Sequence, residues 1–171
     1  NKVPLLFNIL NKPDHEKVLI FCKTKYGADI IVKALEKASI TAASLHSGKT
    51  QAVREEALQN FKDSNLRVLV ATDVAARGID VDNITLVINY NLPEDPRNYI
   101  HRIGRTARAG KSGMAISFAV ENDMRQLNNI ENSIGQVITV VTEQPFHKEL
   151  SKAPKQVKKK GKKTNRTRTK K

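Results

Sequence analysis

The sequence predicts an α/β fold in which a central parallel sheet carries helices on both faces. Short apolar runs rich in β-branched residues alternate along the chain with segments whose apolar residues recur at helical intervals. This alternation is typical of parallel strands joined by right-handed crossover helices, which cover both faces of the sheet. The polar loops that follow the strands then lie together at the carboxyl edge of the sheet, where such folds place their binding sites.

The strands and helices follow one another in a regular order. We expect strands at 18–23, 41–46, 67–72, 84–89 and 113–119. Apolar residues at helical spacing predict connecting helices at 26–38 and 51–63, and flanking helices at 3–11 and at 121–133, the latter ending near Gly135. A third connecting helix begins near Asp95, because an acceptor followed by Pro96 is a helix start signal. The β-branched run 137–141 is compatible with an additional edge strand.

The positive charge is concentrated at the C-terminal end. Of the formal net charge of +13, +11 lies in residues 146–171, which hold twelve Lys or Arg against the single acid Glu149. We therefore divide the chain into a folded domain, 1–145, and a disordered basic tail, 146–171. A cationic tail gains affinity for polyanions by releasing their counterions, so RNA or DNA is the first expected partner. The alternative is a tail that only aids solubility or derives from expression.

The remaining composition restricts the class of protein. The 171 residues contain no apolar run long enough to cross a membrane. The one cysteine, Cys22, lies in an apolar run and permits no internal disulfide, which fits a reducing, cytoplasmic setting. The chain begins at Asn1 and shows no leader sequence, so we expect a fragment of a longer protein. Separately, we expect a monomer.

Hydroxyl, amide and basic groups follow three of the predicted strands. Thr24 follows the first strand, Ser47 to Arg54 follow the second, and Thr72 to Asp80 follow the third. The hydroxyls of Thr24, Ser47, Thr50 and Thr72 are potential donors to phosphate oxygens, and Gly48 allows backbone N–H groups to approach an anion. Each residue alone could equally be a turn or a helix cap. Three aligned loops favour a phosphodiester-binding edge.

Arginines recur every third residue at Arg102, Arg105 and Arg108 within the string 101–110. On a helix this spacing places three guanidinium groups on one face, which suits phosphate oxygens. The alternative is a solvated basic helix. Gly104 to Ser112 superficially resembles a phosphate loop, but it has one residue too many and precedes a strand. The chain thus lacks the phosphate loop and the Mg²⁺ site that phosphoryl transfer requires, and no metal site is expected in it.

Four of these segments, in this order, are similar to motifs of the superfamily 2 DEAD-box RNA helicases. Residues 18–24 resemble motif IV, Gln51 to Arg54 the QxxR element, 71–80 motif V, and 101–110 motif VI, with Ala107 where the family usually has glycine. The resemblance covers about residues 1–135 and implies the C-terminal RecA-like lobe, a three-layer sandwich. The basic tail and a general likeness favour the bacterial RhlE-type enzymes within the family.

The resemblance also implies roles for individual residues. Arg105 and Arg108 match the catalytic arginine fingers that reach the γ-phosphate of ATP, and Asp80 and Gly78 match the contact to the ATP ribose. The residues that match RNA-backbone contacts are Thr24, Gly48, Gln51, Arg54, Thr72 and Gly78. His101 and Asp73 match residues that couple the two lobes, whereas Arg102 is expected to serve the internal structure of this lobe.

We therefore expect the C-terminal half of an RNA-dependent ATPase that separates short duplexes. ATP with Mg²⁺ would be held mainly by an N-terminal RecA-like lobe, and RNA would be bound through its backbone without sequence preference. The 171 residues alone are expected to be inactive. Two alternatives stay open: a non-catalytic RNA-binding or chaperone module, and a lobe of a superfamily 2 DNA translocase.

Overall fold

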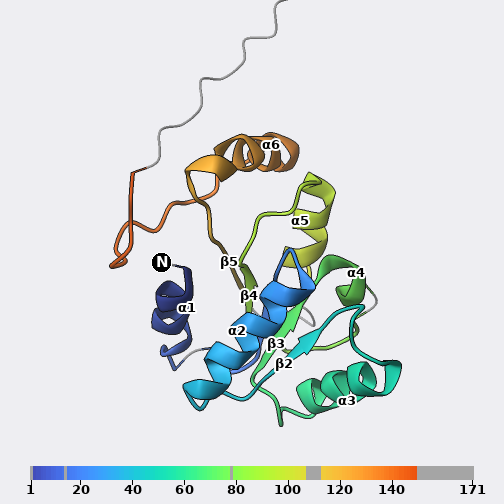
Figure 1. The fold of residues 1–171 in the computed structure, drawn as a ribbon. Coiled ribbons are helices and arrows are strands. Elements are labelled where there is room, and N and C mark those ends of the chain that lie inside the picture. Colours follow the sequence, from blue (N-terminus) through green and yellow to red (C-terminus); the bar gives the residue numbers. More distant parts are fainter. Residues whose placement is uncertain (1, 14, 78, 107–112, 150–171) are drawn as a thin grey trace, which may run out of the picture.

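The computed structural model describes residues 2–13, 15–77, 79–106 and 113–149, and a five-stranded sheet lies at its centre (Figure 1). All neighbouring strands are parallel, in the order β2-β3-β1-β4-β5. The strands are β1 (Val18–Phe21), β2 (Ala42–Leu45), β3 (Val68–Ala71), β4 (Leu86–Asn89) and β5 (Met114–Ser117). Each falls inside one of the five predicted runs, so the predicted parallel sheet is confirmed.

The three inner strands are buried on both faces, which explains their uninterrupted apolar sequences. Successive side chains alternate between the two faces. Val18 and Ile20 of β1 point into the core that contains α1 (Lys2–Leu10) and α2 (Lys25–Lys37). Leu19 and Phe21 point into the opposite core, with α3 (Gln51–Lys62) and α4 (Asp73–Ala76). The layers are therefore helix, sheet and helix.

The helices begin and end where their capping residues require. Thr24 Oγ1 accepts a hydrogen bond from Gly27 N at the start of α2 (3.0 Å), and Asp95 caps α5 (Pro96–Ile103) with Pro96 in its first turn. A short 3₁₀ turn, η1 (Glu121–Asp123), precedes α6 (Met124–Ile134). Gly135 ends α6 with a φ of +70°, a conformation that favours glycine. The helix start expected near Asp95 and the helix end expected near Gly135 are confirmed.

A third, smaller core joins α5 to α6. It contains Leu92, Tyr99 and Ile130, and the two helices lie together at the end of the sheet (Figure 1). This core holds α5 over the carboxyl ends of the strands. The loops after the strands and the start of the arginine string therefore lie at the same end of the molecule.

The predicted helix that would carry three aligned arginines is wrong in its length. Helix α5 ends at Ile103, so it contains Arg102 but not Arg105. Gly104 caps the helix, and two residues later the buried Thr106 hydroxyl donates to Ile84 O (2.8 Å). This tertiary contact draws the chain away from the helix axis. Arg108 lies outside the described residues.

The additional edge strand suggested for 137–141 is not formed. The segment has no strand pairing; Val137, Val140 and Val141 are exposed, while Ile138 contacts the core between α5 and α6. The Ile138 N–H donates to Glu131 Oε1 (3.0 Å), so the backbone here bonds to a side chain of α6 and not to a strand.

The sequence predictions about membrane-spanning segments and about the basic tail are covered by the structure only in part. Across the described residues, no helix combines the length and apolar character that crossing a membrane demands. The boundary between a domain at 1–145 and a tail at 146–171 stays a prediction, since residues 150–171 lie outside the described residues.

Candidate functional site

Three neighbouring strands place their polar loops side by side. The strand order β2-β3-β1 makes the loops after these strands adjacent at the carboxyl edge of the sheet. Each loop ends in a threonine that begins a helix: Thr50 before α3, Thr72 before α4 and Thr24 before α2. The helix starts therefore turn their N–H groups and the positive ends of their dipoles toward the same edge.

The three threonines differ in what their hydroxyls do. Thr24 Oγ1 accepts from Gly27 N and Thr50 Oγ1 accepts from Val53 N (3.4 Å), so both act as caps. Thr72 makes no side-chain capping bond. A capping hydroxyl still carries a proton to donate, and Thr24 and Thr50 are exposed. The arrangement thus presents hydroxyl donors along the edge, as the sequence predicts.

Gln51 and Arg54 form a linked pair on the first turns of α3. Arg54 Nη1 donates to Gln51 Oε1 (3.1 Å), and Gln51 Nε2 donates to Glu55 Oε1 (2.7 Å). The Arg54 Nε atom is buried and has no hydrogen-bond partner among the described residues. A buried, unsatisfied donor on a charged side chain is costly, so Arg54 is a guanidinium whose donors are not all engaged among the described residues.

Gly48 serves a different purpose from the one expected. Its N–H donates to the Nδ1 atom of buried His46 (3.1 Å), so in this structure the N–H is not open to an anion. A Cβ at this position would lie 3.1 Å from the same ring nitrogen. The glycine allows the loop to fold closely over the His46 ring.

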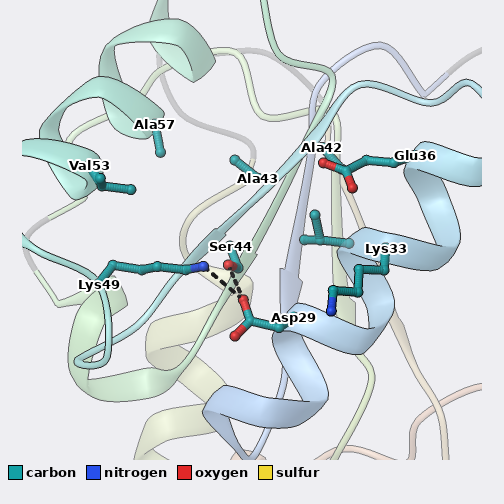
Figure 2. A pocket seen from close by; sticks show the side chains of 10 residues that line it. Asp29, Lys33, Glu36, Ala42, Ala43, Ser44, Lys49, Val53 and Ala57 are labelled. Atoms are coloured by element: carbon teal, nitrogen blue, oxygen red, sulfur yellow. Dashed lines mark hydrogen bonds and ion pairs between the residues drawn. The ribbon is translucent and has the colours of Figure 1, made fainter.

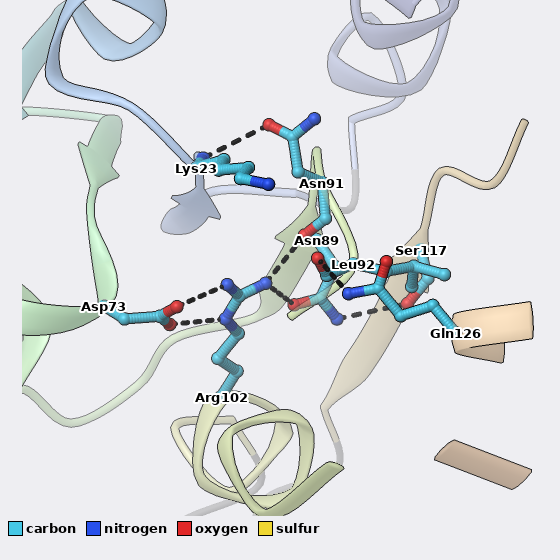
Figure 3. Close-up of polar contacts among 8 residues, drawn as sticks. All are labelled: Lys23, Asp73, Asn89, Asn91, Leu92, Arg102, Ser117 and Gln126. Carbon is cyan, nitrogen blue, oxygen red and sulfur yellow. Dashed lines mark hydrogen bonds and ion pairs between the residues drawn. The ribbon is translucent and has the colours of Figure 1, made fainter. Parts of the chain in front are cut away.

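Arg102 lies at the centre of a buried polar network (Figure 3). It is 2% exposed, and its Nε and Nη2 atoms donate to the two carboxylate oxygens of Asp73 (2.6 and 2.7 Å). Its Nη1 atom donates to Asn89 Oδ1 (2.9 Å) and to Asn91 O (2.7 Å). The guanidinium lies 4.9 Å from the centre of the Phe21 ring.

This network joins the first residue of α4, the end of β4 and α5. Arg102 therefore serves the internal structure of the chain, as expected, and the Asp73 carboxylate is engaged by it. The sequence analysis did not identify Asn89 as a partner. A polar residue at the end of the apolar run of β4 was the available signal.

A small cleft of about 50 Å³ opens between α4 and α5. The side chains that line it include Asp73, Arg77, His101 and Arg105. His101 is exposed on the last turn of α5, and Arg105 follows the helix end. The Arg105 Nη1 atom donates to Ile79 O (2.8 Å), one residue before the exposed Asp80. The structure therefore brings Arg105 and the Asp80 segment together, although they are far apart in sequence.

The site residues fall into three groups. Thr24, Thr50, Thr72, Gln51 and Arg54 lie on the loops and helix starts at the edge, and Arg105, His101 and Asp73 line the cleft beside it. Gly78, Ala107 and Arg108 are outside the described residues.

The chemistry of this edge suits phosphate groups. A partly buried guanidinium with donors to spare binds and neutralises phosphate oxygens, and hydroxyls at helix starts donate to them. The carboxylate of Asp80 is an acceptor for sugar hydroxyls. In the described part of the chain, no three His, Cys, Asp or Glu side chains gather as a metal site would require.

Comparison with known proteins agrees with this geometry. Residues 1–110 match the model of the helicase conserved C-terminal domain. The chain is 44% identical over 144 residues to the ATP-dependent RNA helicase DBP8 of Meyerozyma guilliermondii, covering 83% of this chain and 33% of that protein. It is also 44% identical over 142 residues to the ATP-dependent RNA helicase RhlB of Pseudomonas syringae pv. tomato, covering 83% and 36%. The chain thus spans about a third of these relatives.

Solved structures share the fold over most of the chain. The Escherichia coli DEAD-box protein SrmB, bound to the regulator of ribonuclease activity RraA, superposes with a TM-score of 0.80 at 35% identity, covering 88% of this chain and 90% of that one. Saccharomyces cerevisiae Dbp5 bound to RNA and ADP BeF3 gives 0.74 at 33% identity, covering 80% and 37%. The RecA-like three-layer fold is confirmed.

Proposed function

We infer the function of this chain from its family, because it belongs to the helicase conserved C-terminal domain family as the C-terminal lobe of a DEAD-box ATP-dependent RNA helicase. We propose that the protein containing it is an RNA-dependent ATPase that separates short RNA duplexes. In this proposal the chain supplies one half of a shared site, and an N-terminal RecA-like lobe supplies the other half.

In the ATP half of the site, Arg105 and Arg108 act as arginine fingers toward the γ-phosphate. Their charge stabilises the transferring phosphoryl group, which is the main electrostatic requirement of the reaction. Asp80, with the Gly78 backbone, accepts hydrogen bonds from the ribose hydroxyls. Mg²⁺ and the triphosphate are held mainly by the N-terminal lobe, which fits a chain whose sequence contains no phosphate loop.

In the RNA half, the loops after β1, β2 and β3 contact the sugar-phosphate backbone. Thr24 and Thr72 donate hydroxyl protons to phosphate oxygens, and Arg54, presented by Gln51, supplies charge. We assign Gly48 and Gly78 to the same surface through their loops. Because these contacts address the backbone, binding is largely independent of base sequence.

Closure of the two lobes couples the two halves. RNA that bridges both lobes brings Arg105 to the ATP held by the N-terminal lobe, and His101 and Asp73 lie beside Arg105 to transmit the movement. Coupling of two binding sites is reciprocal, so we expect RNA and ATP each to tighten the other by a factor of about 5–150.

The observation that carries the proposal is the position of Arg105. It lines a cleft at the same edge as the three threonine loops and contacts the segment of Asp80. We expect the isolated 171 residues to show neither ATPase activity nor unwinding, and a separately expressed N-terminal lobe to restore weak RNA-stimulated ATPase. Phosphate release measured with and without each lobe checks this. ATPase activity of the isolated chain would contradict the proposal.

The basic tail adds affinity without specificity. Deletion of residues 148–171 removes twelve cationic residues. We expect weaker RNA binding and a flatter dependence of log Kd on log salt, since each neutralised phosphate of a single strand contributes a slope of about 0.7. Titrations between low and high salt measure both quantities. A variant that keeps the tail length but replaces its Lys and Arg by Gln should behave like the deletion; an unchanged slope in either argues against the tail.

Two alternatives predict different results in these experiments. A non-catalytic RNA-binding module, favoured by the same basic tail, would bind RNA but leave the complemented lobes without ATPase. A DNA translocase lobe would be stimulated by DNA rather than RNA. The RhlE-type subgroup, a monomeric state and a cytoplasmic location stay predictions.

A further inference from the structure

One carboxylate joins three separate elements at the edge strand β2 (Figure 2). Asp29 lies one turn into α2, and its Oδ1 atom accepts a hydrogen bond from Ser44 Oγ (2.6 Å). The same oxygen lies 3.1 Å from His46 Nε2 and 3.1 Å from Lys49 Nζ. We refer to Asp29, Ser44, His46 and Lys49 as the Asp29 cluster. It borders a groove of about 440 Å³ that runs along β2 between α2 and α3.

His46 extends the cluster into the loop after β2. Its Nδ1 atom accepts from Gly48 N, so the hydrogen on the ring belongs to Nε2 and points to Asp29. The ring is buried, and it connects α2 on one side with the backbone of Gly48 on the other. Lys49 adds a second link from the same loop.

The geometry excludes a hydrolytic role for these residues. The hydroxyl of Ser44 is buried and donates to Asp29 rather than to His46, and Asp29 with its lowered pKa is too weak a base to activate a serine. Partial burial disfavours the Asp29 carboxylate, yet the hydrogen bonds from Ser44, His46 and Lys49 outweigh it and hold the pKa of Asp29 well below its usual range. The acceptor therefore stays ionised at neutral pH, and its contribution is lost only as the pH falls into the acid range.

The cluster lies between two parts of the RNA-binding edge. Thr24 begins the helix that carries Asp29, and Thr50 begins α3 one residue after Lys49. The bonds of Asp29 thus set the position of the loop from His46 to Thr50 relative to the start of α2. Two backbone-contacting loops bind neighbouring phosphates only when their separation is fixed.

We propose that Asp29 is a positioning residue for RNA binding, which holds the loop after β2 in register with Thr24 so that Thr50, Gln51 and Arg54 meet the RNA backbone. The proposal rests on the proposed function, because it concerns the same RNA surface. Asp29 itself is assigned no contact with RNA.

The test uses the full-length helicase that contains this chain and measures RNA-stimulated ATPase against RNA concentration. Asp29→Asn keeps the size of the side chain but removes its charge. We expect the RNA concentration for half-maximal activity to rise about tenfold, which corresponds to about 1.4 kcal/mol. The ATPase rate at saturating RNA should stay within about twofold of the wild-type rate, since a saturating concentration of RNA still fills the RNA site and closes the two lobes. A variant that is merely less stable would instead lower the rate at saturation.

Two variants serve as matched controls. Glu36→Gln removes another carboxylate of α2 that borders the same groove but has no ion pair among the described residues, and it should leave the RNA dependence unchanged. Ser44→Ala removes a bond from Asp29 to the strand rather than to the loop, and its effect should be smaller than that of Asp29→Asn.

The outcomes separate the two proposals. An inactive wild-type enzyme would overturn the proposed function. An active wild type with the same RNA dependence in Asp29→Asn would overturn the positioning role alone. An equal rise for Asp29→Asn and Glu36→Gln would also overturn it, because the effect would then follow from charge in general.

Discussion

Replacing Arg105 by alanine is expected to lower ATP turnover by about 10³-fold or more in the complete enzyme, and Arg108→Ala should do the same. The guanidinium of Arg105 donates to the carbonyl oxygen of Ile79 and is only partly buried. No carboxylate of the described residues forms an ion pair with it. Its charge is therefore uncompensated by an acid and available to a phosphate group.

The loss should appear in the chemical step. An arginine that acts mainly in the transition state affects kcat, whereas uniform binding affects KM. Steady-state ATPase at saturating RNA and saturating ATP measures kcat, and the fold of the variant is checked by thermal unfolding. Arg105→Lys should recover little, because lysine lacks the planar fork of donors.

A control from helix α5, which precedes Arg105 in the chain, sharpens this experiment. Arg97 on the first turn of α5 is exposed and pairs with Asp95 (2.8 Å). Arg97→Ala removes one positive charge of the same region and should leave kcat unchanged. If Arg105→Ala and Arg97→Ala both kept turnover within tenfold of the wild type, Arg105 would not be an arginine finger.

Replacing Arg102 by alanine is expected to destabilise the folded chain by about 3 kcal/mol, the lower end of the range for a broken buried ion pair, because the Asp73 carboxylate left without its partner is itself partly exposed. The loss includes the charge partner of Asp73 and the donors to Asn89 Oδ1 and Asn91 O. Domains have about 5–15 kcal/mol of net stability, so this change removes a large share of it. Urea denaturation should show a lower midpoint with an unchanged m value.

A double substitution tests whether the loss of stability comes from the unpaired charge of Asp73. Asp73→Leu together with Arg102→Met removes both charges, and we expect part of the lost stability to return. Arg102→Lys should not rescue it, because a single ammonium cannot replace the bidentate contact to Asp73. A stability of Arg102→Ala within about 1 kcal/mol of the wild type would contradict the network as drawn in Figure 3.

The two arginines thus have separable tests, although they lie three residues apart in one string. Arg105→Ala should retain the folded chain and lose turnover. The main effect of Arg102→Ala should be a lower stability of the folded chain. Any loss of turnover in this variant would be indirect, through the disturbed packing where β4, α4 and α5 meet.

The strands and most helices could be predicted because their signals are local. Inner strands such as β1, buried on both faces, require continuous apolar residues, and helices require one apolar face. Asp95 and Gly135 marked helix ends through their own backbone and side-chain chemistry, whereas the cap at Thr24 was only one of two possibilities in the sequence.

The spacing of the arginines alone could not predict whether they share one face of a helix. A three-residue repeat indicates a common face only while the helix continues, and Gly104 and the bond of Thr106 to Ile84 end it. Similarly, the sequence placed Gly48 in a phosphate-binding loop, but its N–H is taken by His46, whose position depends on the packing of α2 against β2.

The order of the elements, the parallel sheet and the motifs of the family could all be read from the sequence, because each depends on residues close together in the chain. Which polar groups are already engaged became known from the folded arrangement of the chain. Arg102 is bound to Asp73 and Asn89, whereas Arg105 reaches the segment of Asp80. Such pairings depend on distances between strands that are far apart in sequence, which no local pattern of residues encodes.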